Sequence, residues 1–314
     1  MKVMVKTCLM VALMTLSLPV LGTDCTNPDI TLNSQAEVDN FQADYGGVGG
    51  CDTVTGTLWA EGNDIYNLDG LAGLVNVEGT LWVFQNPVLT NLSGLANLTN
   101  VGGNLYIQIN DALTNLDGLA NLTDVSGDLA IQNNAALTNL EGLAQLTNFN
   151  GVLFINFSPA LTNLNGLDNL TSVAYLQISS NPALTNLDGL ANLTSVGALT
   201  IESNATLTNL DAFANLTSVG GDLFIYDNAA LASCYGLATV LDEIDDAGPG
   251  PGSPPIPDVG GLVTLENNLP GCNSVAEALI PPVVTPVPAS GPFALVLLTC
   301  LMLLSGITGV RRQA

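Results

Sequence analysis

The sequence predicts a mainly β protein, a β-solenoid of about nine coils. A unit of 23 or 24 residues recurs through the middle of the chain, and each copy contains one apolar-x-apolar triplet. Self-similarity at such a period is typical of repeat architectures, in which every coil buries its apolar side against its neighbours. The nine triplets, which we expect to be strands, fall at residues 58–60, 81–83, 105–107, 129–131, 153–155, 176–178, 199–201, 223–225 and 263–265.

Each coil contributes about six aliphatic side chains. In one unit these are Leu116, Leu119, Leu122, Val125, Leu129 and Ile131. Burying them gives a gross stabilisation on the order of 10 kcal/mol per coil, most of which chain entropy opposes. Strands stacked about 4.8 Å apart would place nine rungs over roughly 40 Å.

Two further columns accompany the repeat. Asparagines follow the strands, and we expect their amides to bond the backbone of adjacent coils. They are Asn63, Asn86, Asn110, Asn134, Asn181, Asn204, Asn228 and Asn268, with Ser158 the exception. A glycine column suggests a turn with positive φ. It comprises Gly70, Gly94, Gly118, Gly142, Gly166 and Gly189, and Ala212 takes its place in one coil.

The charges are distributed very unevenly. The chain has 28 acidic residues, no histidine and four basic residues, which lie only at the ends: Lys2, Lys6, Arg311 and Arg312. Nucleic acid is excluded as a partner, because the body has no cation to contact phosphate. We predict no cofactor and no metal. Calcium at Asp242, Glu243, Asp245 and Asp246 is the alternative to a solvated acidic loop.

The same composition argues against an enzyme. Without histidine, lysine or arginine in the body, triads, Schiff bases and phosphate clamps are impossible there. A carboxylate pair of the kind that cleaves glycans is the remaining catalytic alternative. We therefore predict no catalytic residues and no enzymatic activity.

Residues 1–22 are expected to be a secretory signal peptide, with a basic start, an apolar run at 8–18 and a cleavage site at 20–22. The alternative is an uncleaved membrane helix. The domain prediction continues with an N-terminal cap at 23–57, the solenoid at 58–232 and a C-terminal cap at 233–280. That cap contains a flexible acidic and Pro/Gly-rich loop, 242–261.

The C-terminal segment indicates a second targeting signal. A Pro-rich linker, 281–292, precedes an apolar stretch at 293–310, which is long enough for a transmembrane helix, and a basic tail at 311–314. The linker ends in a short motif, Val287, Pro288, Ala289, Ser290 and Gly291. Together these features resemble bacterial exosortase-type (PEP-CTERM-like) sorting tails. That resemblance implies a sorting peptidase as partner; a plain membrane anchor and a eukaryotic lipid-anchor signal are the alternatives.

Four cysteines remain in the body: Cys25, Cys51, Cys234 and Cys272. An even number in an exported chain indicates disulfides. Of three possible pairings we favour Cys25–Cys51 and Cys234–Cys272, because each would staple one cap of the solenoid. In the loop-entropy model each would contribute about 3–4 kcal/mol.

The repeat resembles a known frame. Residues 193–207 match LxxLxxLxLxxNxxL, the leucine-rich repeat pattern. With the Leu-Thr-Asn-Leu-x-Gly-Leu segment and the flanking cysteines, the chain is similar to receptor L-domain repeats over about residues 25–280. The resemblance implies a right-handed leucine-rich β-solenoid with short strands on one face and irregular or 3₁₀ turns elsewhere. It also implies binding or adhesion at a cell surface.

A candidate ligand site follows from strand alternation. The residue between two inward apolar residues points outward, so both tryptophans lie on the exposed strand face. We predict that Trp59, Trp82, Phe84, Tyr106 and Phe154 bind a glycan or a surface protein. We expect an exported adhesion protein of the bacterial cell envelope, outer surface or extracellular matrix. A structural spacer or biofilm matrix component without a ligand is the alternative.

Asn-x-Ser/Thr triplets recur as well, and they either carry glycans or reflect only the phase of the repeat. Their asparagines are Asn91, Asn97, Asn121, Asn156, Asn169, Asn192, Asn204 and Asn215.

Overall fold

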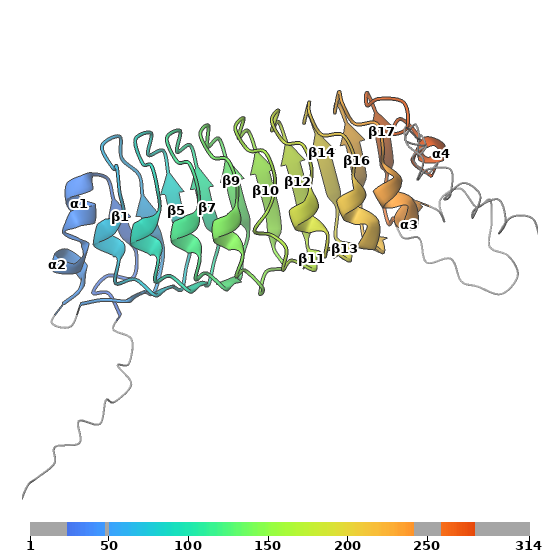
Figure 1. Ribbon diagram of the computed structural model, residues 1–314. Helices are drawn as coiled ribbons and strands as arrows, with labels where there is room; N and C mark the ends of the chain where they lie inside the picture. Colours follow the sequence, from blue (N-terminus) through green and yellow to red (C-terminus); the bar gives the residue numbers. More distant parts are fainter. Residues whose placement is uncertain (1–23, 48–49, 242–258, 280–314) are drawn as a thin grey trace, which may run out of the picture. The chain divides into compact units, whose positions relative to one another are not determined.

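The computed structural model describes residues 24–47, 50–241 and 259–279, and the main feature is a stack of parallel strands (Figure 1). All described residues belong to the first of two units, Met1–Ile280; the second is Pro281–Ala314. Ten strands pair in register in one parallel sheet. They are β1 (Ile30–Leu32), β3 (Leu58–Ala60), β5 (Leu81–Phe84), β7 (Leu105–Gln108), β9 (Leu129–Gln132), β10 (Val152–Asn156), β12 (Tyr175–Ser179), β14 (Leu199–Glu202), β16 (Leu223–Tyr226) and β17 (Val263–Glu266).

All nine predicted strands are present, and β1 adds a tenth that the repeat pattern does not contain. Each coil contributes one strand to the sheet and returns over the core to begin the next, which gives a parallel solenoid-like β fold (Figure 1). The aliphatic side chains predicted to face inward do so: those of the unit from Leu116 to Ile131 have no exposed surface.

The other sides of the coils carry shorter elements. Two-residue strands form two small parallel sheets. One contains β2 (Thr53–Val54), β4 (Asn76–Val77), β6 (Asn100–Val101) and β8 (Asp124–Val125), and the other β11 (Ser172–Val173), β13 (Ser195–Val196) and β15 (Ser218–Val219). A third side consists of 3₁₀ turns: η1 (Asp69–Leu71), η2 (Ser93–Leu95), η3 (Asp117–Leu119), η4 (Glu141–Leu143), η5 (Asp188–Leu190), η6 (Asp211–Asn215) and η7 (Tyr235–Leu237).

The asparagine column forms a hydrogen-bonded ladder inside the corner after each strand. The Asn110 amide nitrogen donates to the Val83 carbonyl of the preceding coil (2.9 Å), while its Oδ1 accepts the Asn86 backbone N–H (3.1 Å). The same pair of bonds recurs at Asn181, Asn204 and Asn228, all fully buried. The predicted backbone role of this column is therefore confirmed.

Two positions depart from the ladder. Asn63 was predicted to belong to it, and this prediction is wrong: Asn63 is exposed, and the Gly62 N–H donates to Asn86 Oδ1 (2.9 Å) in its place. The corner of this coil is one residue shorter, so Gly62 occupies the ladder position. At Ser158 the short side chain bonds only its own coil, to the Asn156 carbonyl at 3.5 Å, and the ladder is interrupted.

The expectation for the glycine column is also wrong. Of its six members only Gly166 has positive φ. The others are needed because a Cβ would overlap a backbone carbonyl of the preceding coil; at Gly118 this is the Leu92 oxygen. Positive φ occurs instead at the residue before each ladder position from Asn86 to Asn268, in side chains as varied as Gln85, Ile109 and Phe157.

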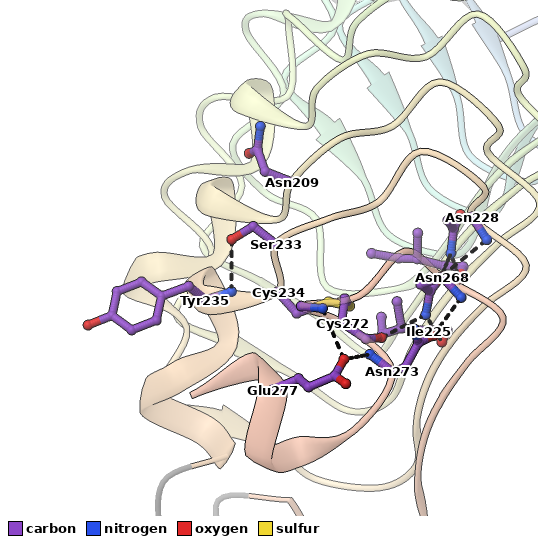
Figure 2. The surroundings of a disulfide bond; sticks show 12 residues. Asn209, Ile225, Asn228, Ser233, Cys234, Tyr235, Asn268, Cys272, Asn273 and Glu277 are labelled. Atoms are coloured by element: carbon purple, nitrogen blue, oxygen red, sulfur yellow. Dashed lines mark hydrogen bonds between the residues drawn. A yellow bond between two sulfur atoms is a disulfide. The ribbon is translucent and has the colours of Figure 1, made fainter. Parts of the chain in front are cut away.

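Both ends of the solenoid carry disulfide-bonded caps. Cys25 bonds Cys51 and Cys234 bonds Cys272, as predicted, with Cα–Cα distances of 4.8 and 5.2 Å. The N-terminal cap includes α1 (Gln35–Asp39) and α2 (Phe41–Tyr45), and the C-terminal end includes α3 (Ala238–Leu241) and α4 (Val275–Ala278). Figure 2 shows the second disulfide beside the last rungs of the asparagine ladder, Asn228 and Asn268.

Each cap also contains a serine-capped helix start related to a capping box, which the repeat pattern does not contain. Ser34 and Ser274 accept the backbone N–H of Glu37 and Glu277, at the start of α1 and α4. The Glu277 carboxylate in turn accepts the N–H groups of Gly271 and Asn273 (Figure 2). A Ser-x-x-Glu pattern at 34–37 and 274–277 is the sequence signal that predicts this arrangement.

Several predictions lie outside the described residues. They are the signal peptide 1–22, nearly all of the loop 242–261, the linker and sorting motif 281–292, the transmembrane segment 293–310 and the tail 311–314. Among the helices that the structure does describe, none combines the length and apolar character needed to cross a bilayer.

Candidate ligand-binding face

The outward side of the ten-stranded sheet carries two columns of side chains. In-register parallel pairing aligns Trp59 with Trp82 and Trp82 with Tyr106. Each of the three lies between two buried core residues of its strand and therefore faces outward. The second column begins with Glu61 and Phe84. The side chains of both columns named so far, Trp59, Trp82, Tyr106, Glu61 and Phe84, are partly exposed, as the strand alternation predicted.

Trp59, Trp82 and Tyr106 form a continuous row of contacting rings, which we call the aromatic ladder. The Trp59 and Trp82 ring centroids are 4.6 Å apart at an interplanar angle of 18°, and those of Trp82 and Tyr106 are 4.2 Å apart at 55°. Phe84 lies edge-on to both tryptophans, at 6.0 and 6.1 Å. Because strand spacing is close to the preferred separation of stacked rings, pairing register alone brings these rings together.

Phe154 does not join this cluster. Ala130, which is buried, occupies the outward position between Tyr106 and Phe154 in the sheet. Phe154 instead contacts Tyr175 edge-on, with centroids 5.9 Å apart, and the Tyr175 hydroxyl donates to Thr200 Oγ1 (3.0 Å). The structure therefore brings four of the five predicted residues together and places the fifth in a second, smaller group.

Tyr175 was missed because the predicted strand began at residue 176. The alternation of outward positions, extended back by two residues from Gln177, reaches Tyr175 and would have identified it.

Polar side chains of the second column bond along the solenoid: Gln108 donates to Gln132 (2.9 Å) and Ser179 donates to Glu202 (2.8 Å). Within one coil, the Trp59 indole N–H donates to Glu61 Oε2 (2.8 Å). Asn156 breaks this second column, since its buried Oδ1 has no hydrogen-bond partner among the described residues. It lies two residues before the interruption at Ser158, so the middle coil is irregular on two sides.

The electrostatic character of the face is uniformly negative or neutral. Residues 24–279 contain no lysine, arginine or histidine, so no acidic side chain there has a basic one to pair with. Burial, together with the nearby Asp128 carboxylate, raises the pKa of Tyr106 above its usual value. The face therefore offers aromatic area, amide groups and unpaired carboxylates.

A second asparagine column accounts for most of the glycosylation-type triplets. Asn97, Asn121 and Asn169 each donate their amide N–H to an alanine carbonyl of the preceding coil, at 2.7–2.8 Å. Asn192 and Asn215 make equivalent bonds, and Asn156 and Asn204 are buried. Five of these amides already bond the neighbouring coil and two are buried, which favours the repeat interpretation at seven of the eight sites.

Metal chemistry finds no support in the described part of the chain. No group of three or more cysteine, aspartate or glutamate side chains gathers there in a way that could hold a metal ion. The run from Asp242 to Asp246, weighed as a calcium site, lies outside the described residues.

The geometry defines a class: a disulfide-capped parallel β-solenoid with an aromatic, anionic outer sheet face. Comparison with protein-family models and with curated proteins finds no match for the chain.

Proposed function

We propose that this chain is a non-enzymatic binding or adhesion protein that uses the outward strand face, centred on the aromatic ladder, to hold a partner. One observation carries the proposal: both tryptophans of the chain, Trp59 and Trp82, lie partly exposed and in contact on that face, beside Phe84 and Tyr106. Clustered aromatic side chains with polar neighbours are characteristic of protein and glycan binding surfaces.

The same proposal includes location. The two disulfides fit an oxidising compartment. We propose a right-handed leucine-rich solenoid of the receptor L-domain type, exported through residues 1–22 and held at the cell envelope or matrix by the tail. An exosortase-type peptidase would recognise residues 287–291, and residues 293–310 would enter the membrane.

Replacing Trp59 and Trp82 by alanine tests the binding role. We expect the double variant to remain folded and to lose at least tenfold of its binding to cells, glycan arrays or surface-protein extracts, because the loss of central aromatic contacts costs about 2 kcal/mol or more. Circular dichroism would verify the fold. The matched control is Tyr66→Ala with Tyr235→Ala, two tyrosines that are 54% and 41% exposed away from the sheet face.

A second candidate is a structural spacer without a ligand, and one observation favours it. Rings of the aromatic ladder contact one another, so part of their area stabilises the ladder rather than facing a partner. If the double variant loses stability, by about 0.5–1.5 kcal/mol per ring pair, while every binding signal stays unchanged, the spacer function is correct and the binding role is rejected.

The tail is tested separately. The intact mass of the protein recovered from its producing cell would show whether the mature chain begins at Thr23 and whether it ends near residue 291. A mass that includes residues 292–314 would contradict processing by a sorting peptidase and would leave the tail as a membrane anchor.

A further inference from the structure

Trp59 ends the aromatic ladder, so one face of its indole has no stacked ring among the described residues, and we call this side the free face. One face stacks on Trp82. The opposite face is directed at β1, where Thr31 is the register partner of Trp59. Thr31 is small and exposed, and no aromatic ring among the described residues contacts that side of the indole. Trp82 has no such face, because Trp59 and Tyr106 lie on its two sides.

Carboxylates stand on both sides of this free face along the strand direction. Glu61 follows Trp59 by two residues, and its Oε2 accepts the indole N–H at 2.8 Å. Asp29 precedes Thr31 by two residues, and its Oδ1 accepts the Thr57 backbone N–H at 2.7 Å. Asp29 directly precedes β1 and Glu61 directly follows β3, and strand alternation places residues 29, 31, 59 and 61 on the outward side of the sheet. At about 3.3 Å per residue, the Cα atoms of Asp29 and Glu61 lie roughly 7 Å on either side of the level of Trp59.

These carboxylates are held in place yet remain available. Each uses one oxygen to accept a fixed hydrogen bond, and the second oxygen accepts none from the described residues. No basic side chain of residues 24–279 exists to neutralise them. A ligand that covers this surface must therefore bring positive charge itself, since two uncompensated carboxylates would otherwise lose water without a partner.

We propose that this end of the face binds the guanidinium groups of an arginine-rich protein segment, which names the partner class for the function proposed above and rests on it. A guanidinium is flat, weakly hydrated and carries a fork of five donors. It stacks on the open indole face of Trp59 by cation–π attraction, and its N–H groups reach the free oxygens of Glu61 and Asp29. A lysine ammonium supplies the same charge without the planar stacking, and a neutral glycan supplies no charge.

The test uses short blocked peptides of the form Gly-Arg-Gly-Arg-Gly and the same peptides with lysine, added to the full-length protein. Because the chain contains two tryptophans, both on this face, tryptophan fluorescence reports binding at the site itself. We expect the arginine peptide to bind about fivefold more tightly than the lysine peptide. The Trp59→Ala variant should bind both peptides equally. Its binding is measured by calorimetry, because the substitution removes one of the two fluorescent tryptophans.

Two isosteric variants separate charge from structure. Glu61→Gln and Asp29→Asn keep an oxygen acceptor for the bonds to Trp59 and Thr57, so both should fold normally. Each should weaken arginine-peptide binding about threefold or more. Glu141→Gln and Asp117→Asn remove the same charges from the exposed 3₁₀ side and should leave the affinity within about 1.5-fold, which controls for the general negative field.

Equal affinity of wild type for the two peptides, or an effect of the control variants as large as that of Glu61→Gln, would overturn the inference and leave only non-specific attraction. The proposed function has its own outcome. If the Trp59 and Trp82 double variant loses adhesion although the arginine peptide shows no preference, the face binds a partner of another kind and only the guanidinium assignment fails.

Discussion

Most coils carry one asparagine amide that bonds the backbone of the coil before it. In Asn110 the side chain donates to the Val83 carbonyl and accepts the Asn86 N–H, so it satisfies backbone groups of the preceding coil that no strand pairing reaches. Aspartate could not donate, and serine is too short to reach either group. A buried corner of this geometry therefore requires asparagine. Where Ser158 replaces it, the side chain bonds only its own coil and the ladder is interrupted.

Ser158→Asn should stabilise the protein by roughly 1 kcal/mol, because it restores an acceptor for the Asn134 N–H and a donor for the preceding coil. Urea unfolding would measure the free-energy change, and hydrogen exchange of the Asn134 amide should slow. The converse variant Asn110→Ala should destabilise by about 1–3 kcal/mol, since it orphans buried backbone groups. A lower stability of Ser158→Asn would mean that the corner of the middle coil is packed too tightly around Ser158 to accept the larger asparagine side chain.

The Glu277 cap gives a pH dependence of known sign. Hydrogen bonds from the backbone N–H groups of Asn273 and Gly271 lower the pKa of this carboxyl below its usual value. A lowered folded-state pKa means that the stabilisation is present above the unfolded pKa and disappears as the pH falls through the folded one. The melting temperature of wild type should therefore exceed that of Glu277→Gln at neutral pH, and the difference should shrink in acid. A difference that is constant with pH would contradict this assignment.

At the scale of the coil, close backbone approach determines the glycine column. A Cβ at Gly118 would overlap the Leu92 carbonyl oxygen, whereas at Gly220 the nearest atom, the Gly197 oxygen, would lie at 3.4 Å. Ala212, a natural occupant of the column, sits in η6, which is longer than the other 3₁₀ turns, so a coil that accepts alanine has changed its turn.

Gly118→Ala should accordingly cost about 1–3 kcal/mol through local overpacking. Gly220→Ala, the control, should stay within about 0.5 kcal/mol of wild type. Denaturant midpoints with unchanged slopes would establish both values. Equal effects of the two substitutions would mean that loss of backbone freedom, rather than contact between coils, governs the column.

Sequence periodicity predicts the coil well, because inward aliphatic positions and strand register follow from the same repeat. It misses features that depend on a single coil. β1 lies outside the repeat frame, the corner at Gly62 is one residue short, and Tyr175 precedes the strand core. For the candidate site, the pattern identifies the outward rings, but only the structure shows that the ladder rings contact one another and that no second ring stacks on Trp59.

Across the whole molecule, stability is expected to vary with position. Each coil contacts its neighbours along the stack, so the end coils have only one side protected and depend on their caps. The C-terminal disulfide closes a separation of 38 residues and holds α4 and β17 beside the last ladder rungs (Figure 2).

Replacing Cys234 and Cys272 by serine should lower the stability of the C-terminal coils by about 4 kcal/mol in the loop-entropy model. Hydrogen exchange should then rise in β16 and β17 and stay unchanged in β5 and β7. The matching variant of Cys25 and Cys51 should affect β1 and β3 instead. A uniform rise along the chain would contradict local stapling and indicate a single cooperative unit.

The asparagine ladder has a consequence for how such a protein can change its reach. In a coil that carries the ladder asparagine, the amide bonds the coil before it, and the amide of the next coil bonds its own backbone. Both junctions created by duplicating such a unit would therefore be chemically the same as those already present. Duplication or loss of a whole unit would orphan no buried group and would shift the far tip by about 4.8 Å. The length of the solenoid can thus change in small, nearly neutral steps.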